Sequence, residues 1–422
     1  MRIDSKKMNG MCTCGKEHLM VTRGAVIEAG ATARFAELLR EYNISGKACA
    51  VYDQNTYQAK NLHRPEAVCE VILDPENLHA NEAGVAAAKE QMAGNSFDYL
   101  IAVGGGTVHD ITRYCANEMH IPFVSCPTAA SVDGFCSTVS AMTWGGCKKT
   151  MPGVAPDIVI ADTDVVRVAP RHLALSGIGD ILGKYTALAD WKITHELNGE
   201  EVCSRIHDMT MDAVKAVYDC SDGAAAGDAD ATEQLMYALL LSGLAMQLMG
   251  NSRPASGAEH HISHLIEMEP PGLQVSSDAS HGEKVGVATI LISEYYHRLA
   301  QTADIAPFVR PYRTFTDAEL RDCYGERLLD GILSENRPDL AEAVSEQDLL
   351  RAWPAIRKII TECIPSAQDL RDLYTRVGMK ASLTDLRVPE EKLEELIYFS
   401  PSVRQRITFN RISRMLDTKR MS

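Results

Sequence analysis

Three histidines in the second half of the chain and one aspartate upstream of them have the residue types of a divalent-metal site. His260 and His264 lie four residues apart in SGAEHHISH, so they share one face if that segment is helical. His281 follows in DASHGEKVGVA beside Gly282, and Asp180 lies far upstream in SGIGDILGKY. Two imidazoles and one carboxylate leave coordination positions open for a substrate oxygen, as in catalytic rather than structural metal sites.

The spacing leaves alternatives open. On a helix His261 would point about 100° away from His260, which makes it the weaker ligand candidate. A single histidine is more often a surface or core residue, and Asp180 would also serve as a helix N-cap. The residues alone therefore predict a metal site without deciding which of the histidines belong to it.

A glycine triplet, Gly104–Gly106, predicts a phosphate-binding loop. It follows the apolar strand-like segment FDYLIAV and precedes the helix-like segment TVHDITRYCANE. Backbone amides at a helix N-terminus, unobstructed by side chains, suit a pyrophosphate. The pattern differs from G-x-G-x-x-G, and a tight turn is the alternative. Its place at the carboxyl end of a predicted strand favours nucleotide binding.

Two more segments are candidates for the same crevice. The small and hydroxyl residues of 127–131, PTAAS, follow another predicted strand. Asp53 ends the strand-like segment KACAVYD, where a carboxylate would accept hydrogen bonds from ribose hydroxyls and repel a 2′-phosphate. This mildly favours NAD over NADP, whereas a turn or cap role is the alternative for Asp53.

Cys12, Cys14 and His18 form a C-x-C-x3-H group near the N-terminus. Thiols and an imidazole at this spacing are ligands for a soft metal. The group supplies three ligands, and no fourth is visible nearby in the sequence. Local structure without a metal is the more ordinary interpretation.

The elements that must position these residues change in kind along the chain. Up to about residue 168, apolar strand-like segments alternate with helix-like segments, which predicts a mostly parallel sheet with helices on both faces. Beyond it, 171–197 has long helical periodicity, and 233–250 is apolar on several faces, as in a buried helix. We therefore expect a Rossmann-like α/β domain at 1–168, which binds a dinucleotide, and an all-α domain at 169–422, which binds metal and substrate.

Composition excludes several classes of function. The 422 residues carry a formal net charge of −15, which would repel nucleic acid and anionic membranes. No apolar stretch approaches the roughly 20 residues that span a bilayer, and the N-terminus lacks the apolar core of a signal peptide. The expected location is the cytoplasm, with most of the 12 cysteines reduced.

Five stretches together resemble a known superfamily: VGGGTVHD, PTAASVDGFCS, SGIGDILGKYTALADWK, SRPASGAEHHISH and SHGEKVGV. They are similar to the iron-containing alcohol dehydrogenase and dehydroquinate synthase-like superfamily, and most of all to the bacterial sn-glycerol-1-phosphate dehydrogenase family. The resemblance implies the dehydroquinate synthase-like fold and a homodimer. It also implies NAD or NADP as cofactor, one Zn²⁺, Ni²⁺ or Fe²⁺ ion, and a small phosphorylated triose as substrate.

The resemblance also implies residue roles. The metal ligands would be Asp180, His260 and His281, and the substrate contacts would be Asp133, Asp180 and His264. Asp133 and His264 would also be the catalytic residues. With the loop residues above, the dinucleotide contacts would be Asp53, Gly104, Gly105, Gly106, Thr107, Val108, His109, Asp110, Thr128, Ala129, Ala130, Ser131 and Ser137.

The implied reaction interconverts dihydroxyacetone phosphate and sn-glycerol 1-phosphate by hydride transfer. The metal would polarise the ketone, and His264 or a water on the metal would deliver the proton. Lys184 and Arg253 are the candidate phosphate ligands. Three alternatives stay open: a glycerol or other small-alcohol dehydrogenase, a dehydroquinate synthase-like lyase, and a metal-binding regulatory protein without catalysis.

Overall fold

The computed structural model describes residues 1–145 and 147–421, which form two compact units. Unit 1 contains Met1–Ile181 and Asp212–Asn251, and unit 2 contains Leu182–Met211 and Ser252–Ser422. The chain therefore leaves unit 1, returns to it and leaves it again. The predicted division at residue 168 marks where the strands end, and it stays a prediction for the domains themselves.

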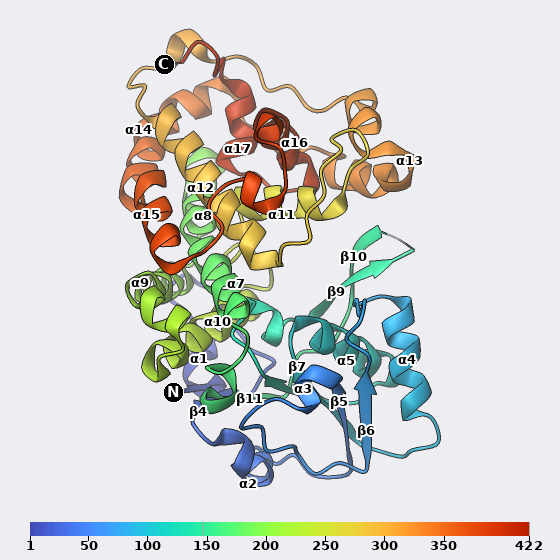
Figure 1. The fold of residues 1–422 in the computed structure, drawn as a ribbon. Helices are drawn as coiled ribbons and strands as arrows, with labels where there is room; N and C mark the ends of the chain where they lie inside the picture. The colour runs from blue at the N-terminus through green and yellow to red at the C-terminus, as the bar shows by residue number, and fades with distance from the viewer. Residues whose placement is uncertain (146, 422) are drawn as a thin grey trace. The chain divides into compact units, whose positions relative to one another are not determined.

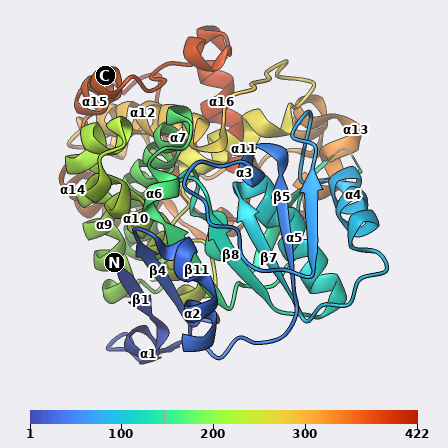
Figure 2. The same ribbon diagram turned by 60° about the horizontal axis from the view of Figure 1, so that its bottom comes forward.

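Unit 1 is built on a seven-stranded sheet with the strand order β1-β4-β11-β8-β7-β5-β6 (Figures 1 and 2). Strand β1 pairs antiparallel with β4, and the other neighbours pair in parallel. The mostly parallel sheet predicted from the sequence is thus confirmed. The strands are β1 (Arg2–Asp4), β4 (Gly24–Glu28), β5 (Ala48–Asp53), β6 (Cys69–Leu73), β7 (Tyr99–Gly104), β8 (Phe123–Pro127) and β11 (Ile158–Asp162).

Both faces of the sheet are buried, because alternate residues of each strand enter different cores. Leu100 and Ala102 of β7 pack against helices α4 and α5, whereas Ile101 and Val103 pack against the side on which α2 lies. The helices of unit 1 that surround the sheet or follow it are α1 (Ser5–Met8), α2 (Phe35–Glu41), α3 (Gln54–Tyr57), α4 (Glu82–Met92), α5 (Gly106–Met119), α6 (Thr163–Val166) and α10 (Ala229–Met249).

Helix α10 confirms the prediction of a buried apolar helix at 233–250. Most of its side chains are buried, and its last turn ends at Gly250 in a left-handed conformation. Two helices cross from one unit to the other: α7 (Arg171–Leu182) and α9 (Ser204–Ala226). The helical periodicity predicted at 171–197 is confirmed, with an interruption at Gly183, after which α8 (Lys184–Asn198) begins.

Two hairpins were not predicted. One joins β9 (Val139–Trp144) to β10 (Cys147–Pro152), and the other joins β2 (Gly10–Met11) to β3 (Glu17–His18). Their strands are short or polar, so they lack the apolar runs that reveal a central strand. The second hairpin contains the C-x-C-x3-H group.

Unit 2 is helical over the residues that the structure describes, apart from one isolated bridge between Val309 and Leu416. Among the described helices, none is both long and apolar enough to traverse a lipid bilayer. In addition to α8, the helices are α11 (Ala258–Met268), α12 (His281–Ala300), α13 (Asp317–Asn336), α14 (Glu346–Cys363), α15 (Ala367–Val377), α16 (Leu393–Phe399) and α17 (Phe409–Ile412).

Candidate metal and nucleotide sites

Three histidines converge in unit 2, where α11 packs against α12. His260 and His264 lie one turn apart on α11, and His281 is the first residue of α12. The ring centroids of His260 and His281 are 5.4 Å apart, and that of His264 lies 6.0 Å from His260 and 5.5 Å from His281. The helical face predicted from the four-residue spacing therefore exists, and it meets the third histidine.

A carboxylate holds the Nδ1 atom of each of these rings. His260 Nδ1 donates to Glu259 Oε1 at 2.6 Å, and His281 Nδ1 donates to Glu267 Oε1 at 2.9 Å. His264 Nδ1 lies 3.3 Å from the other oxygen of Glu267. With the proton fixed on Nδ1, each Nε2 presents its lone pair, which is the arrangement of metal-ligating histidines.

Glu259 is itself fully buried and held from several sides. It accepts hydrogen bonds from Thr186 Oγ1 at 2.5 Å and from the Gly257 amide at 2.7 Å. Burial raises the pKa of Glu259, but the hydrogen bonds from His260, Thr186 and Gly257 outweigh it and lower the pKa below its usual range. Glu259 is therefore a fixed negative charge behind His260.

Glu267 plays the same part for the other two histidines. Burial opposes its ionisation, yet His281 and His264 hold its pKa well below the usual range. Lys284 adds a cation 3.6 Å from Glu267 Oε1. Sequence reasoning missed both glutamates, although Glu259 directly precedes a candidate ligand and Glu267 lies one helical turn beyond His264.

Glu267 also offers a second ligand set, because one ligand atom each from His264, Glu267 and His281 lies within 4.8 Å of the others. A metal there would compete with the two Nδ1 hydrogen bonds for the Glu267 oxygens. The Nε2 side of the rings involves no such competition, so it is the side that fits an ion.

His261 points away from this cluster. Its ring is fully buried, and burial with the nearby positive charge of Arg406 places its pKa well below the usual range. It is a neutral core histidine, as the 100° helical offset predicted.

Asp180 lies in unit 1, fully buried near the end of α7. The alternative that it caps the start of a helix is therefore wrong. Its Oδ2 accepts a hydrogen bond from the Asp133 amide at 2.9 Å. The two predicted substrate-contacting carboxylates of unit 1 are thus neighbours.

Asp133 begins a short 3-10 turn, Asp133–Cys136, that is held from both sides. Ser242 of α10 donates to Asp133 Oδ2 at 2.8 Å. A Cβ at Gly243 would lie 2.6 Å from the Asp133 carbonyl oxygen, so α10 approaches this closely only with glycine there. Sequence reasoning missed Ser242 because it occurs within an apolar run.

Arg113 completes the support of this turn. It is fully buried on α5 and donates to Gly134 O at 2.8 Å and to Phe135 O at 3.2 Å, as well as to Asp110 at 2.7 Å. Asp110, a predicted cofactor contact, is thereby the counter-ion of Arg113. Burial lowers the pKa of Arg113, and Asp110 compensates part of that cost.

The predicted nucleotide segments meet at one edge of the sheet. Asp53 ends β5, Gly104 ends β7 and Pro127 ends β8, and these are three adjacent parallel strands. The Thr128 amide donates to Gly104 O at 3.2 Å, which ties the two loops together. The carboxyl edge of a parallel sheet is where α/β folds bind nucleotides.

The glycine triplet forms the start of α5 as predicted. Gly105 is the N-cap residue, and Gly106, Thr107, Val108, His109 and Asp110 form the first turns. The amides of a first helical turn point along the axis and favour an anion. A Cβ on Gly105 would meet nothing within 4 Å, so this residue borders open space.

In the first turn of α5, two side chains face the interior. Val108 is buried, and His109 is 1% exposed. His109 Nδ1 donates to Gly105 O at 2.9 Å, while Ser125 donates to its Nε2 at 2.8 Å. Burial lowers the pKa of His109 to about 3, so it is a neutral brace beneath the loop.

The remaining cofactor candidates have mixed surroundings. Thr128, Ala129, Ala130 and Ser131 are buried after β8, and a Cβ at Gly177 of α7 would lie 2.1 Å from Ala130 O. Ser137 is partly exposed and bonds to the backbone of Val139.

Asp53 caps α3 through a capping box with Thr56, whose amide donates to Asp53 Oδ1 at 2.8 Å. The cap role considered for Asp53 is therefore present. Its ribose contact stays a prediction.

Lys184 and Arg253, the predicted phosphate ligands, are both buried cations of unit 2, and their role stays a prediction. Arg253 is buried and is held by Glu200 and by Ile407 O, and Lys184 is fully buried. Arg404 and Arg406 instead extend from the segment after Ser400–Val403, which packs on α11. Arg406 donates to Ser252 Oγ at 2.7 Å, in the segment that leads into α11.

Burial lowers the pKa of His264 to about 4, and the charges of His281 and Arg404 contribute to the shift, against the hydrogen bond to Glu267. Arg404 is therefore a positive charge close to His264. No sequence pattern distinguished it from the other arginines of the C-terminal region.

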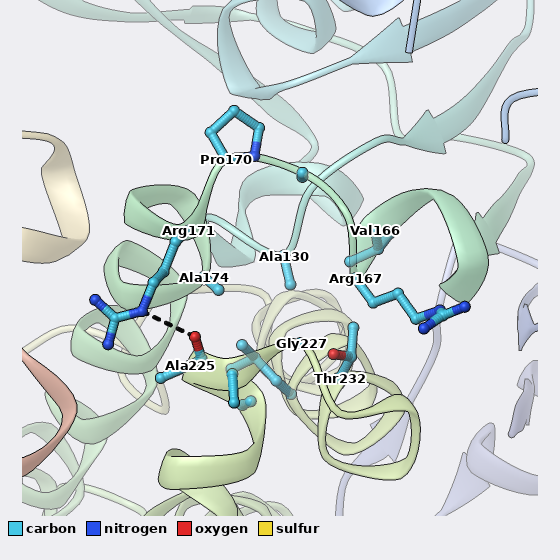
Figure 3. Close-up of a pocket in the computed structure, with 13 residues that line it drawn as sticks. Ala130, Val166, Arg167, Pro170, Arg171, Ala174, Ala225, Gly227 and Thr232 are labelled. Atoms are coloured by element: carbon cyan, nitrogen blue, oxygen red, sulfur yellow. Dashed lines mark hydrogen bonds between the residues drawn. The ribbon is translucent and has the colours of Figure 1, made fainter. Parts of the chain in front are cut away.

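A separate pocket of unit 1 lies near the start of α7 (Figure 3). Its lining includes Arg167 and Arg171, and Arg171 Nε donates to Ala225 O at 3.0 Å. Of the predicted site residues it contains Ala130 alone. It is therefore not the nucleotide edge described above.

The comparisons with known proteins agree with this fold. The family model described as iron-containing alcohol dehydrogenase matches residues 26–170. Solved structures share the fold. Maleylacetate reductase from Rhizobium sp. strain MTP-10005 has a TM-score of 0.55 and 16% identity, and the match covers 89% of this chain and 88% of that one. Glycerol dehydrogenase from Schizosaccharomyces pombe has a TM-score of 0.51 and 20% identity, and the match covers 85% of this chain and 92% of that one.

Sequence relatives cover from two thirds to nearly all of the chain. The glycerol-1-phosphate dehydrogenase [NAD(P)+] of Bacillus licheniformis is 33% identical over 96% of this chain and 92% of its own length. That of Geobacillus thermodenitrificans is 40% identical over 67% of this chain and 70% of its own length. These relatives define a class of NAD(P)-dependent dehydrogenases. More particularly, the chain belongs to the iron-containing alcohol dehydrogenase family, alongside these glycerol-1-phosphate dehydrogenases.

Proposed function

We propose that the protein is an NAD(P)-linked, metal-dependent dehydrogenase that interconverts dihydroxyacetone phosphate and sn-glycerol 1-phosphate. The observation that carries the proposal is the set of carboxylate-anchored histidines, in a chain whose relatives of that name match it along most of its length. The cofactor and the divalent metal follow from membership of the family.

Asp180, His260 and His281 would hold the metal. Two neutral imidazoles with Nδ1 occupied and one buried carboxylate fit a divalent cation, and the set tolerates Zn²⁺, Ni²⁺ or Fe²⁺. A metal in this site supplies Lewis-acid chemistry to the oxygen of the reacting carbon. Glu259 and Glu267 orient the rings and increase their basicity.

The nucleotide would bind at the carboxyl edge of β5, β7 and β8. The first amides of α5 would receive the pyrophosphate, and His109 keeps that loop in place from below. Asp53 would contact the ribose with the oxygen that does not cap α3. The nicotinamide supplies or accepts the hydride, and the chain orients it.

Asp133 and His264 would act on the substrate hydroxyls. Ser242 fixes one Asp133 oxygen, which leaves the carboxylate oriented to accept from a substrate hydroxyl. Glu267 holds His264 at Nδ1, so Nε2 is the atom that exchanges a proton with the reacting oxygen.

The substrate phosphate would bind to Arg404, with the charge of Arg406 behind it. Arg404 pairs with Glu335 at 3.4 Å, and its side chain is exposed. Arg253 is buried between Glu200 and the Ile407 carbonyl, and Lys184 is fully buried, so they are the less accessible candidates. A guanidinium near the proton-exchanging histidine suits a triose, whose phosphate and carbonyl are separated by one carbon.

The oligomeric state and the cellular location are also part of the proposal. We expect a homodimer and a cytoplasmic location, both by likeness to the family. Sedimentation at micromolar concentration tests the first, and cell fractionation tests the second.

The test compares NADH oxidation with dihydroxyacetone phosphate and with unphosphorylated dihydroxyacetone, in metal-stripped and metal-restored protein, with chiral analysis of the product. We expect metal-dependent turnover that prefers the phosphorylated ketone and yields sn-glycerol 1-phosphate. A preference for dihydroxyacetone would instead indicate a glycerol-type dehydrogenase. The absence of net NADH turnover with either ketone would indicate a lyase or a regulatory protein.

A further inference from the structure

The N-terminal hairpin has the geometry of a metal-binding knuckle. Strands β2 and β3 pair antiparallel, with Gly10 opposite His18. The turn between them closes through the Gly15 amide, which donates to Cys12 O at 2.9 Å, and the Cys12 amide, which donates to Lys16 O at 2.9 Å. This turn directs both thiols toward the histidine on the returning strand.

The side-chain atoms of this group converge. One ligand atom each from Cys12, Cys14 and His18 lies within 4.8 Å of the others. Cys14 Sγ is 3.2 Å from His18 Nε2, and His18 is 3% exposed. Two sulfurs and one imidazole nitrogen thus face a common point.

His18 is oriented like a ligand. Its Nδ1 donates to the Leu248 carbonyl at 2.7 Å, so the proton lies on Nδ1 and the Nε2 lone pair faces the thiols. The Leu248 carbonyl belongs to the last turn of α10, where helical carbonyls lack intrahelical partners. A backbone partner at the second nitrogen is the usual support of a metal-bound histidine.

The hairpin is a small element. Each of its strands has two residues, and Cys12 and Cys14 are not joined in a disulfide. An isolated two-stranded hairpin is marginal in water, and small elements of this kind are commonly stabilised by a metal or a disulfide.

We propose that Cys12, Cys14 and His18 bind a structural soft divalent cation, Zn²⁺ by preference, separate from the metal that serves catalysis. Binding releases the thiol protons to solvent, because the ligands are thiolates. Soft thiolates select zinc over the hard cations that carboxylates hold. A tetrahedral site needs four ligands, so one position is left for water or for another thiolate.

The ion would fasten the N-terminal segment to α10. Just beyond the hairpin, the amides of Val21 and Thr22 donate to Gln247 Oε1 at 3.0 and 3.1 Å, and Gln247 donates to Cys136 O at 2.5 Å. Cys136 closes the turn that begins at Asp133. Loss of the ion would therefore loosen the C-terminal end of α10 and, less strongly, the Asp133 turn.

The test measures bound metal per chain by mass spectrometry after expression with zinc and the catalytic metal supplied. We expect two equivalents in the wild type, one in Cys12→Ser/Cys14→Ser, and one in Asp180→Ala. The matched control is Cys220→Ser, which replaces a partly buried thiol elsewhere in unit 1 and should retain two equivalents. The cysteine double variant should also melt about 5–10 °C lower.

Cobalt substitution identifies the ligands. Sulfur-to-cobalt charge-transfer absorption should be present in Asp180→Ala and absent in Cys12→Ser/Cys14→Ser. Intensity for two thiolates, or for three, supports the proposal. In the second case Cys203→Ser should reduce it, since Cys203 is 2% exposed and precedes α9, whose later residues belong to unit 1.

A second measurement does not depend on how the variants fold. In the wild type, Cys12 and Cys14 are partly exposed, so they react with a thiol reagent when no metal protects them. We expect protection in the zinc-loaded chain and rapid modification after chelation, mapped by peptide mass spectrometry. One metal equivalent in the wild type, or equal reactivity with and without zinc, would overturn the proposal.

Discussion

The histidine cluster of unit 2 and the Cys-His hairpin of unit 1 orient their rings in the same way but differ in every other respect. In both, Nδ1 is occupied and Nε2 faces the candidate ion. The acceptor is a buried or half-buried carboxylate in unit 2 and a helix carbonyl in unit 1. A carboxylate increases the basicity of the ring and carries charge, whereas a carbonyl only positions it.

This difference in the groups that hold the rings indicates which of the two sites is catalytic. The unit 2 cluster offers nitrogen donors backed by carboxylates, and Arg404 adds a positive charge near His264. The hairpin offers sulfur donors, and its histidine is held by a backbone carbonyl instead of a carboxylate. Nitrogen and oxygen ligands with charged groups nearby are typical of catalytic sites, whereas thiolate-rich sites are typically structural.

The largest expected effect comes from removing the carboxylate ligand of the catalytic site. Asp180→Ala should lower kcat with dihydroxyacetone phosphate by about 10³-fold or more, because Lewis-acid stabilisation contributes several kcal/mol. Steady-state NADH oxidation and metal content measure the change. The Cys12→Ser/Cys14→Ser protein is the counterpart, and its kcat should fall less than about threefold at 25 °C.

The comparison breaks if these two results are exchanged. Full loss of turnover in the cysteine variant, with its structure intact by circular dichroism, would place chemistry at the hairpin. An active Asp180→Ala protein that has lost one metal equivalent would remove the metal from the mechanism.

The second effect tests the carboxylate that supports two rings. Glu267→Gln retains the shape but removes the charge, and an amide oxygen accepts from His264 and His281 less strongly. Losing such an outer partner typically costs about 10- to 100-fold in metal affinity or activity. Metal titration and kcat both report it. Glu269→Gln, the same change at an exposed residue after the helix, is the control.

The third effect concerns the phosphate. Arg404→Gln should raise KM for dihydroxyacetone phosphate by about 10- to 100-fold, as expected for one charge-assisted hydrogen bond, and leave dihydroxyacetone kinetics unchanged. Arg310→Gln, an exposed arginine that pairs with Asp417, is the control. An equal loss with both ketones would show that Arg404 supports the fold rather than the phosphate.

Much of the fold was predictable because its signals are local. The buried strands read as apolar runs, and Gly104–Gly106 sits where a strand ends and a helix begins. The β2–β3 hairpin was not predictable, because strands of two residues leave no periodicity. The break at Gly183 was hidden for the opposite reason, since both flanking segments are strongly helical.

In the candidate site, the spacing of two histidines was visible in the sequence and their hydrogen-bond partners were not. His260 and His264 lie four residues apart, whereas Glu267 bonds to His264 on its own helix and to His281 at the start of α12, a residue that only the folded chain brings close. Arg113 reaches the turn after Asp133 from a different element, so no local pattern reveals it. Arg253 was predicted to bind phosphate from its charge alone, and in the folded chain its guanidinium forms an ion pair with Glu200.

The smallest effect sharpens the comparison with a histidine that binds no ion. Both nitrogens of His109 are occupied inside unit 1, and burial lowers its pKa to about 3, against about 6.5 in an unfolded chain. Above pH 6.5 neither state is protonated, so His109 adds no pH dependence. Below pH 6.5 the unfolded chain binds a proton at His109 that the folded chain does not bind, so the free energy of unfolding falls by about 1.4 kcal/mol per pH unit as the pH is lowered.

His109→Gln, which can still donate to Gly105 and accept from Ser125, should lose that dependence between pH 6.5 and 4.5. Urea unfolding of both proteins in chelator measures it, so that loss of metal affects them equally. Parallel declines in the two proteins would mean that His109 is protonated when folded.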